Sequence, residues 1–232
     1  VIVWNAPSDH VLGPTREQIH GLGPVIPAGG PPWWQDRRDE LQRIAREHGS
    51  AYVYHRASSE LAAKQLLAIR GVDRIFYAMK ANPHPELLKT FAGLGLSFEC
   101  VSRGECEHVM KVVPGIDPSR ILFTPNFAPR SEYEWALEQG VNLTIDNVYA
   151  LREWGELFRD RDVLIRIDTG FGRGHHDHVR TAGVHSKFGV PLFEMDEVER
   201  LVNLVGARVV ALHAHTGSGV FDVRNWQEVG QL

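Results

Sequence analysis

Cysteine is rare in this sequence, with Cys100 and Cys106 the only two among 232 residues. Two cysteines are too few for a disulfide scaffold, and no second pair is present to complete a structural zinc site. This scarcity indicates a reduced, cytoplasmic setting. Long apolar runs are missing too, since the apolar stretches are much shorter than the roughly 20 residues of a membrane helix.

The chain also has no surplus of positive charge. It carries 25 basic and 29 acidic residues, for a net charge of −4. This balance provides neither a basic surface for nucleic acid nor a polybasic membrane anchor. With 43% hydrophobic and 23% charged residues, the composition is typical of a globular protein with a sizeable core. We therefore expect no nucleic-acid partner and no membrane partner.

Proline and glycine gather at the start of the chain. Residues 1–32 hold six of the 13 prolines and five of the 22 glycines, and both residue types disfavour helix and sheet. We interpret residues 1–32 as a linker or arm and residues 33–232 as the folded domain. Because the first residue is Val1, we also expect that a preceding segment has been removed.

Helix-like and strand-like segments alternate from residue 36 onward. Helices are predicted over residues 36–48, 58–69, 85–94, 104–113, 131–139, 147–158 and 193–204, and strands over 51–54, 74–80, 97–101, 121–124, 142–145, 163–168 and 208–215. Ser131 and Glu134 fit a capping box at one helix start. Such alternation predicts a parallel sheet covered by helices, in either a doubly wound sheet or a (β/α)8 barrel.

Polar residues at the carboxyl ends of successive strands favour the barrel. They are Lys80, Glu99, Ser102, Asn126, Asp146, Arg166, Asp168, His213 and His215. Groups that converge from many strand ends are typical of a TIM-like (β/α)8 barrel. About six strands follow from the Lys80 strand onward, whereas a barrel needs about eight, so we expect an incomplete barrel.

Lys80 ends the apolar stretch Ile75–Met79. We expect this position to be buried, which would favour the neutral amine that forms a Schiff base. The alternative is a structural ion pair with Glu99 or Asp146. Spacing alone does not choose between the two.

The stretch His213–Gly219 (HAHTGSG) places two histidines on one face of a strand, ahead of a Gly-Ser-Gly turn. It could hold a metal, form a structural histidine pair, or bind an anion such as phosphate through its backbone amides and Ser218.

The loop at residues 170–178 contains His175, His176 and His178. We interpret it as a mobile active-site loop rather than a metal cluster. It opens no helix, so it does not fit a dinucleotide fingerprint.

Four motifs together resemble the barrel-type pyridoxal 5'-phosphate (PLP) decarboxylases of diaminopimelate, ornithine and arginine. They are Tyr77–Asn82 (YAMKAN), Phe98–Glu105 (FECVSRGE), Ser186–Gly189 (SKFG) and His213–Gly219. The resemblance implies that Lys80 holds PLP as a Schiff base and that His215 stacks on its ring. It also implies that Ser218 and the backbone at Gly217 bind the phosphate. Glu99 and Glu105 would then support the histidine, and Arg166 would lie near the ring hydroxyl. The resemblance implies no metal ion in the site. On the residues alone, Glu105 is an acidic first-turn residue of a helix.

The motifs look closest to diaminopimelate decarboxylase, and the tract Asp168–Gly189 is similar to the decarboxylase half of bifunctional aspartate kinase/diaminopimelate decarboxylases. This similarity implies an amino-acid substrate, conversion of meso-diaminopimelate to lysine, a homodimer and a fusion to an aspartate kinase. An ornithine or arginine decarboxylase and a non-catalytic PLP-binding barrel remain alternatives; a metal-dependent barrel hydrolase is disfavoured by the motif order. The family's Glu-Pro-Gly-Arg segment and C-terminal β-domain are not found in this sequence. We therefore expect the chain alone to be inactive.

Overall fold

The computed structural model of the chain describes residues 32–170, 187–215, 217 and 224–231. The chain divides into two compact units, residues 1–62 and 63–232. The expected boundary near residue 32 lies at the edge of the described residues and stays a prediction. In the described part, no helix has both the length and the apolar character needed to cross a membrane.

The first unit contains helix α2 (Arg38–His48), which ends at Gly49, and helix α3 (Arg56–Leu67) crosses into the second unit. The strand predicted over residues 51–54 is wrong, because residues 51–55 form neither helix nor strand. Tyr52 and Tyr54 are exposed and stack on each other with ring centroids 6.5 Å apart. Alternating aromatic residues suit a strand only when a partner strand is present, and no described strand pairs with this segment.

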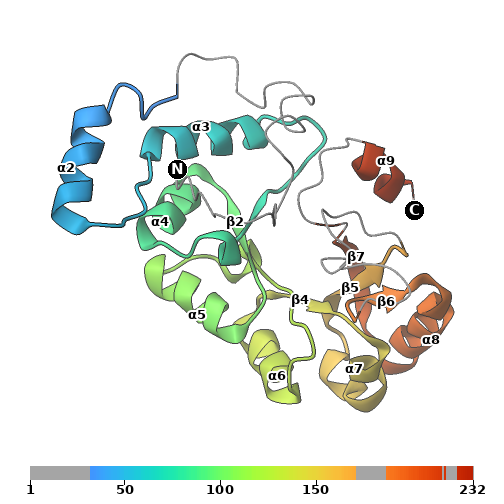
Figure 1. The fold of residues 1–232 in the computed structure, drawn as a ribbon. Coiled ribbons are helices and arrows are strands. Elements are labelled where there is room, and N and C mark those ends of the chain that lie inside the picture. Colours follow the sequence, from blue (N-terminus) through green and yellow to red (C-terminus); the bar gives the residue numbers. More distant parts are fainter. Residues whose placement is uncertain (1–31, 171–186, 216, 218–223, 232) are drawn as a thin grey trace, which may run out of the picture. The chain divides into compact units, whose positions relative to one another are not determined.

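A parallel sheet forms the centre of the second unit (Figure 1). Its described strands are β1 (Phe76–Ala78), β2 (Ser97–Cys100), β3 (Ile121–Phe123), β4 (Asn142–Ile145), β5 (Asp162–Asp168), β6 (Val190–Pro191) and β7 (Arg208–Ala214). The sheet order is β1-β2-β3-β4-β5-β6, and β7 also pairs with β5. Strands β1 to β6 pair in the order of the sequence, and every pairing, including that of β5 with β7, is parallel. This arrangement confirms the predicted α/β class.

Helices α4 (Pro85–Leu94), α5 (Arg103–Val112), α6 (Arg130–Gln139), α7 (Val148–Glu153) and α8 (Met195–Val205) lie between strands in the sequence, and α9 (Arg224–Gly230) follows β7. Local sequence sets several of their ends. Pro85 occupies the first turn of α4, and Gly95 closes that helix in the left-handed conformation, as expected for proline and glycine at these positions.

Two predicted helix details are wrong. The capping box of Ser131 and Glu134 does not form, because α6 begins one residue earlier with Pro129 at its N-cap, and Glu134 accepts a hydrogen bond from Arg130 Nε at 2.7 Å instead. The helix predicted over 147–158 is interrupted after Glu153 and continues as a 3-10 turn over Gly155–Phe158. Strand β6, only two residues long, was too short to be seen in the sequence.

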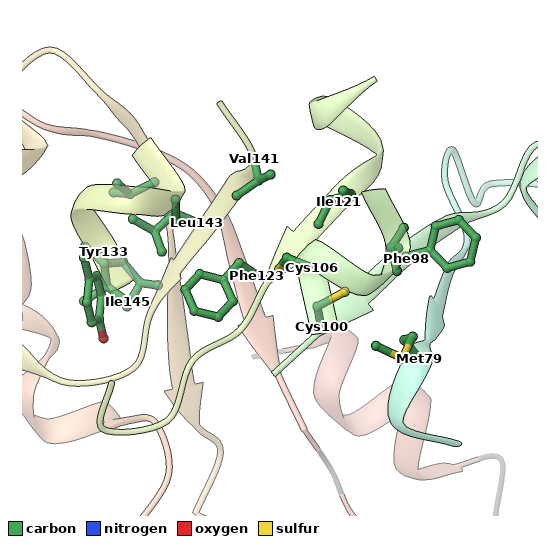
Figure 2. Close-up of a cluster of buried hydrophobic side chains, with 14 of the residues drawn as sticks. Met79, Phe98, Cys100, Cys106, Ile121, Phe123, Tyr133, Val141, Leu143 and Ile145 are labelled. Atoms are coloured by element: carbon green, nitrogen blue, oxygen red, sulfur yellow. The ribbon is translucent and has the colours of Figure 1, made fainter. Parts of the chain in front are cut away.

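One face of the sheet packs into the hydrophobic core, and Figure 2 shows part of that core. Alternate residues of the strands are completely buried there: Phe98, Cys100, Ile121, Phe123, Leu143, Ile145, Val163 and Ile165. Because side chains alternate across a strand, the residues between them point to the opposite face. That opposite face carries polar groups such as Glu99 and Arg166, and it forms the candidate site.

Candidate functional site

A cavity of about 490 Å³ lies at the carboxyl ends of the strands of the second unit. Its polar lining consists of Lys80, Glu99, Asn126, Arg166, His213 and His215, and Phe76, Ala78, Leu122 and Phe188 complete it. Its volume is in the range of small-molecule sites. A larger hollow of about 860 Å³ in the first unit is lined by residues between Trp33 and Tyr54, with no charged group or histidine. The smaller cavity therefore holds the candidate chemistry.

Lys80 lies in a 3-10 turn, Met79–Ala81, directly after β1. The expected burial of this lysine is wrong, because its side chain is 54% exposed. Strand β1 ends at Ala78, so Lys80 is carried beyond the covered part of the sheet. Its Nζ lies 3.6 Å from Glu99 Oε2, and the other carboxylate oxygen of Glu99 accepts a hydrogen bond from the Thr124 hydroxyl. Of the two proposed ion-pair partners, the structure shows Glu99.

The segment that follows Lys80 is held by several hydrogen bonds. Asn82 N donates to Met79 O at 3.1 Å, and the Tyr77 hydroxyl donates to Asn82 O at 3.3 Å. His108 Nε2, on α5, lies 2.9 Å from Pro83 O. It donates the hydrogen bond, because a carbonyl oxygen can only accept one. The turn that carries Lys80 is thus tied both to its own strand and to a neighbouring helix.

Arg166, on β5, is nearly buried at 8% exposure. Its Nη1 donates to Asn126 Oδ1 at 2.7 Å, and its guanidinium lies 5.0 Å from the centroid of the Phe188 ring. Burial lowers the pKa of Arg166, whereas the charges of Asp146, Glu99 and Asp168 raise it. A guanidinium stays charged in such surroundings, so the cavity contains a fixed cation.

The two histidines of the HAHTGSG stretch both line the cavity. Burial, with the positive charges of Arg166, His215 and Lys80, lowers the pKa of His213 to about 4. Burial also lowers the pKa of His215, with smaller contributions from Arg166 and Lys80. Both rings are therefore neutral at neutral pH. Nδ1 of His213 is buried and has no hydrogen-bond partner among the residues that the structure describes.

Among the described residues, no group of three His, Cys, Asp or Glu side chains could hold a metal ion. His213 and His215 therefore have no third metal ligand within that part of the chain. Residues 171–186, with His175, His176 and His178, lie outside the described residues, and so does Ser218. The interpretations that fall on them stay predictions.

Glu105 and Gly217 do not line the cavity within the described part of the chain. Glu105 Oε2 accepts a hydrogen bond from Val101 N at 2.8 Å, and Ser102 Oγ accepts one from Glu105 N at 3.3 Å. These bonds cap the start of α5. The roles that the resemblance implies for Glu105 and Gly217 stay predictions.

Two lining residues had no assigned role in the sequence prediction. Asn126 was noted only as a polar residue after a strand, and Phe188 only as part of the SKFG motif. The hydrogen bond and the ring contact to Arg166 give both a place in the site. A one-dimensional pattern could not show that the loop after β3 meets a side chain of β5.

Comparison with known proteins agrees with this geometry. Residues 59–230 match the model of the pyridoxal-dependent decarboxylase family, pyridoxal binding domain. A diaminopimelate decarboxylase of Methanothermobacter thermautotrophicus is 35% identical over 150 residues, which is 64% of this chain and 35% of that protein. An ornithine decarboxylase of Neurospora crassa is 34% identical over 148 residues, 63% of this chain and 29% of that protein.

The fold has solved counterparts. A crystal structure of a Helicobacter pylori diaminopimelate decarboxylase mutant with L-lysine superposes with a TM-score of 0.73 at 25% identity, covering 82% of this chain and 50% of that one. The chain thus spans about half or less of the relatives it matches. Its sheet of parallel strands is part of a PLP-decarboxylase barrel, as predicted. With the family model covering most of its length, the chain belongs to the pyridoxal-dependent decarboxylases.

Proposed function

We propose that this chain forms the cofactor-binding part of a decarboxylase that converts meso-diaminopimelate to lysine. One observation carries the proposal: Lys80 lies at a cavity that also gathers Glu99, Arg166 and two neutral histidines. The choice of substrate is supported by diaminopimelate decarboxylase relatives, including one of Streptomyces coelicolor that is 33% identical over 182 residues.

The residues of the cavity fit PLP. Lys80 supplies the amine that would hold the aldehyde of the cofactor, and its exposed position keeps that amine open to exchange with a substrate amine. Arg166 supplies a fixed cation for the ring hydroxyl. The neutral, partly buried imidazole of His215 offers a flat surface for the ring. When bound, PLP would supply the electron sink for loss of the carboxylate as carbon dioxide.

Each side chain then has a task of its own. Glu99 positions the Lys80 amine at 3.6 Å and is itself fixed by Thr124. Arg166 is fixed by Asn126 and Phe188, so its charge stays in one place. As part of the proposal, Gly217 and Ser218 bind the phosphate and Glu105 supports the histidine indirectly, through the α5 start that it caps.

The decisive experiment is to trap the cofactor. Protein mixed with PLP and reduced with borohydride should carry the phosphopyridoxyl group on Lys80, located by peptide mass spectrometry. Lys80→Arg keeps the charge beside Glu99 and should lose both the label and the Schiff-base absorbance. Lys89→Arg is the matched control, since Lys89 is equally exposed and paired with Glu86 at 2.8 Å. Labelling that is equal in Lys80→Arg would overturn the assignment.

The substrate is tested by carbon dioxide release from meso-diaminopimelate, ornithine and arginine with the native protein. Release from diaminopimelate alone supports the proposal. The ornithine decarboxylase relative favours ornithine as the second candidate. A protein that binds PLP at Lys80 but releases no carbon dioxide from any of them is the non-catalytic barrel.

Three other parts of the proposal rest on the resemblance alone: a homodimer, a fusion to an aspartate kinase and inactivity of the chain by itself. Light scattering of the native protein tests the first, and the carbon dioxide assay on the 232-residue chain tests the last. A reducing cytoplasmic setting is proposed from the scarcity of cysteine.

A further inference from the structure

Asp146 is a buried carboxylate that lies outside the cavity lining. It follows β4 and is 1% exposed. Its Oδ2 accepts a hydrogen bond from Phe127 N at 3.2 Å, and its Oδ1 accepts bonds from the Tyr133 hydroxyl at 3.1 Å and from Asn147 Nδ2 at 2.8 Å. Burial raises its pKa, and the bonds from Phe127 and Tyr133 oppose that shift. A buried carboxylate with three donors is costly to assemble and holds its partners in place.

The bond to Phe127 lies at a strained point of the backbone. Phe127 has φ of 53°, in the left-handed region that a bulky residue rarely adopts. The residue is 60% exposed, so burial does not compensate for that conformation. The N–H of this strained residue donates the hydrogen bond to Asp146.

The residue before Phe127 reaches the cavity. Asn126 Oδ1 accepts the 2.7 Å hydrogen bond from Arg166 Nη1, and both residues line the cavity. Asp146 directly after β4, the loop after β3 and Arg166 on β5 thus form a continuous chain of contacts. The negative charge of Asp146 also acts on Arg166.

We infer that Asp146 is a positioning residue of the cofactor cavity: by holding Phe127 in its strained conformation, it sets Asn126 and, through Asn126, the guanidinium of Arg166. The expected effect of Asp146 on the affinity for PLP rests on the proposed function. The structural half of the inference, the order of the Asn126–Phe127 loop, holds independently of any cofactor.

Three variants separate this role from general stability. Asp146→Ala removes the acceptor of Phe127 N–H, whereas Asp146→Asn keeps an acceptor oxygen and should rescue most of the loss. Asn126→Ala removes only the link to Arg166. Tyr133→Phe is the matched control, because it removes a bond to the same carboxylate but leaves the Phe127 bond in place.

The expected results are specific. Asp146→Ala and Asn126→Ala should each weaken PLP binding by about tenfold, and the double variant should be no weaker, as for residues that act through one contact chain. Tyr133→Phe should stay within about twofold of wild type in affinity while losing thermal stability. Affinity is read from a titration of the bound-cofactor absorbance.

Hydrogen exchange of the cofactor-free protein supplies the second readout. In Asp146→Ala, the Asn126–Phe127 amides should exchange faster, while those in the middle of α6 should not change. If wild type does not bind PLP but exchange still changes this way, the proposed function fails and the positioning role stands. Additive losses in the double variant, or wild-type affinity in Asn126→Ala, would overturn the inference, even if Asp146→Ala does not fold.

Discussion

The ammonium of Lys80 lies 3.6 Å from the carboxylate of Glu99, with the lysine half exposed and the glutamate largely covered. An ion pair with one exposed partner contributes little to stability, typically about 0–1 kcal/mol. The arrangement therefore keeps Lys80 oriented while leaving its amine accessible.

The Lys80–Glu99 pair should be weak in a double-mutant cycle. Lys80→Met, Glu99→Gln and the double variant, compared by urea unfolding, should give a coupling free energy below about 1 kcal/mol. A coupling of about 3 kcal/mol or more would instead mark a buried structural pair and would count against Lys80 as the cofactor lysine.

Gly189 should tolerate no side chain. It has φ of 81°, and a Cβ there would lie 2.8 Å from the Ile167 carbonyl carbon and 2.9 Å from Asp168 N. Gly189→Ala should lower the free energy of unfolding by about 3 kcal/mol, because strain and a backbone clash add. Gly71→Ala is the control, since Gly71 has φ of 80° with nothing within 4 Å. It should cost about 1 kcal/mol. Equal losses in the two variants would show that no clash exists at Gly189.

His213 should make stability depend on pH. Its pKa falls to about 4 in the folded protein, chiefly through burial, whereas the unfolded value is about 6.5. The folded state thus binds this proton less tightly than the unfolded chain. The free energy of unfolding that depends on a neutral His213 should be fully present above about pH 6.5. It should fall by up to about 3 kcal/mol as the pH drops toward 4. In His213→Phe, urea unfolding across this window should show a smaller loss; an unchanged pH profile would refute the assignment.

The two cysteines should be unreactive in the folded protein. Cys100 and Cys106 are completely buried in the core shown in Figure 2. A hydrogen bond with Cys106, together with burial, raises the pKa of the Cys100 thiol, and the thiolate is the reactive form. Iodoacetamide at neutral pH should leave both unmodified by mass spectrometry until urea is added. Rapid alkylation of the native protein would contradict this placement.

Several elements could be predicted closely because local chemistry determines them. The helix Pro85–Leu94 and the strand Asn142–Ile145 begin and end where the sequence predicted. Proline at a helix start and glycine at its end act over a few residues, and a short apolar strand between turns needs no distant partner to be recognised. The segment at residues 51–54 failed because its pattern requires a neighbouring strand.

The motifs along the chain were enough to predict the family, and the alternation of helix-like and strand-like segments was enough to predict the parallel α/β fold, because both are local patterns. Lys80 as the lysine that holds the cofactor stays a prediction. Long-range packing settled the rest. It left Lys80 half exposed beside Glu99, joined Asn126 to Arg166, and placed Asp146 behind the strained Phe127. These contacts join residues 19 to 40 positions apart in the sequence. No local pattern encodes them, because they depend on which strands become neighbours and how far each side chain reaches.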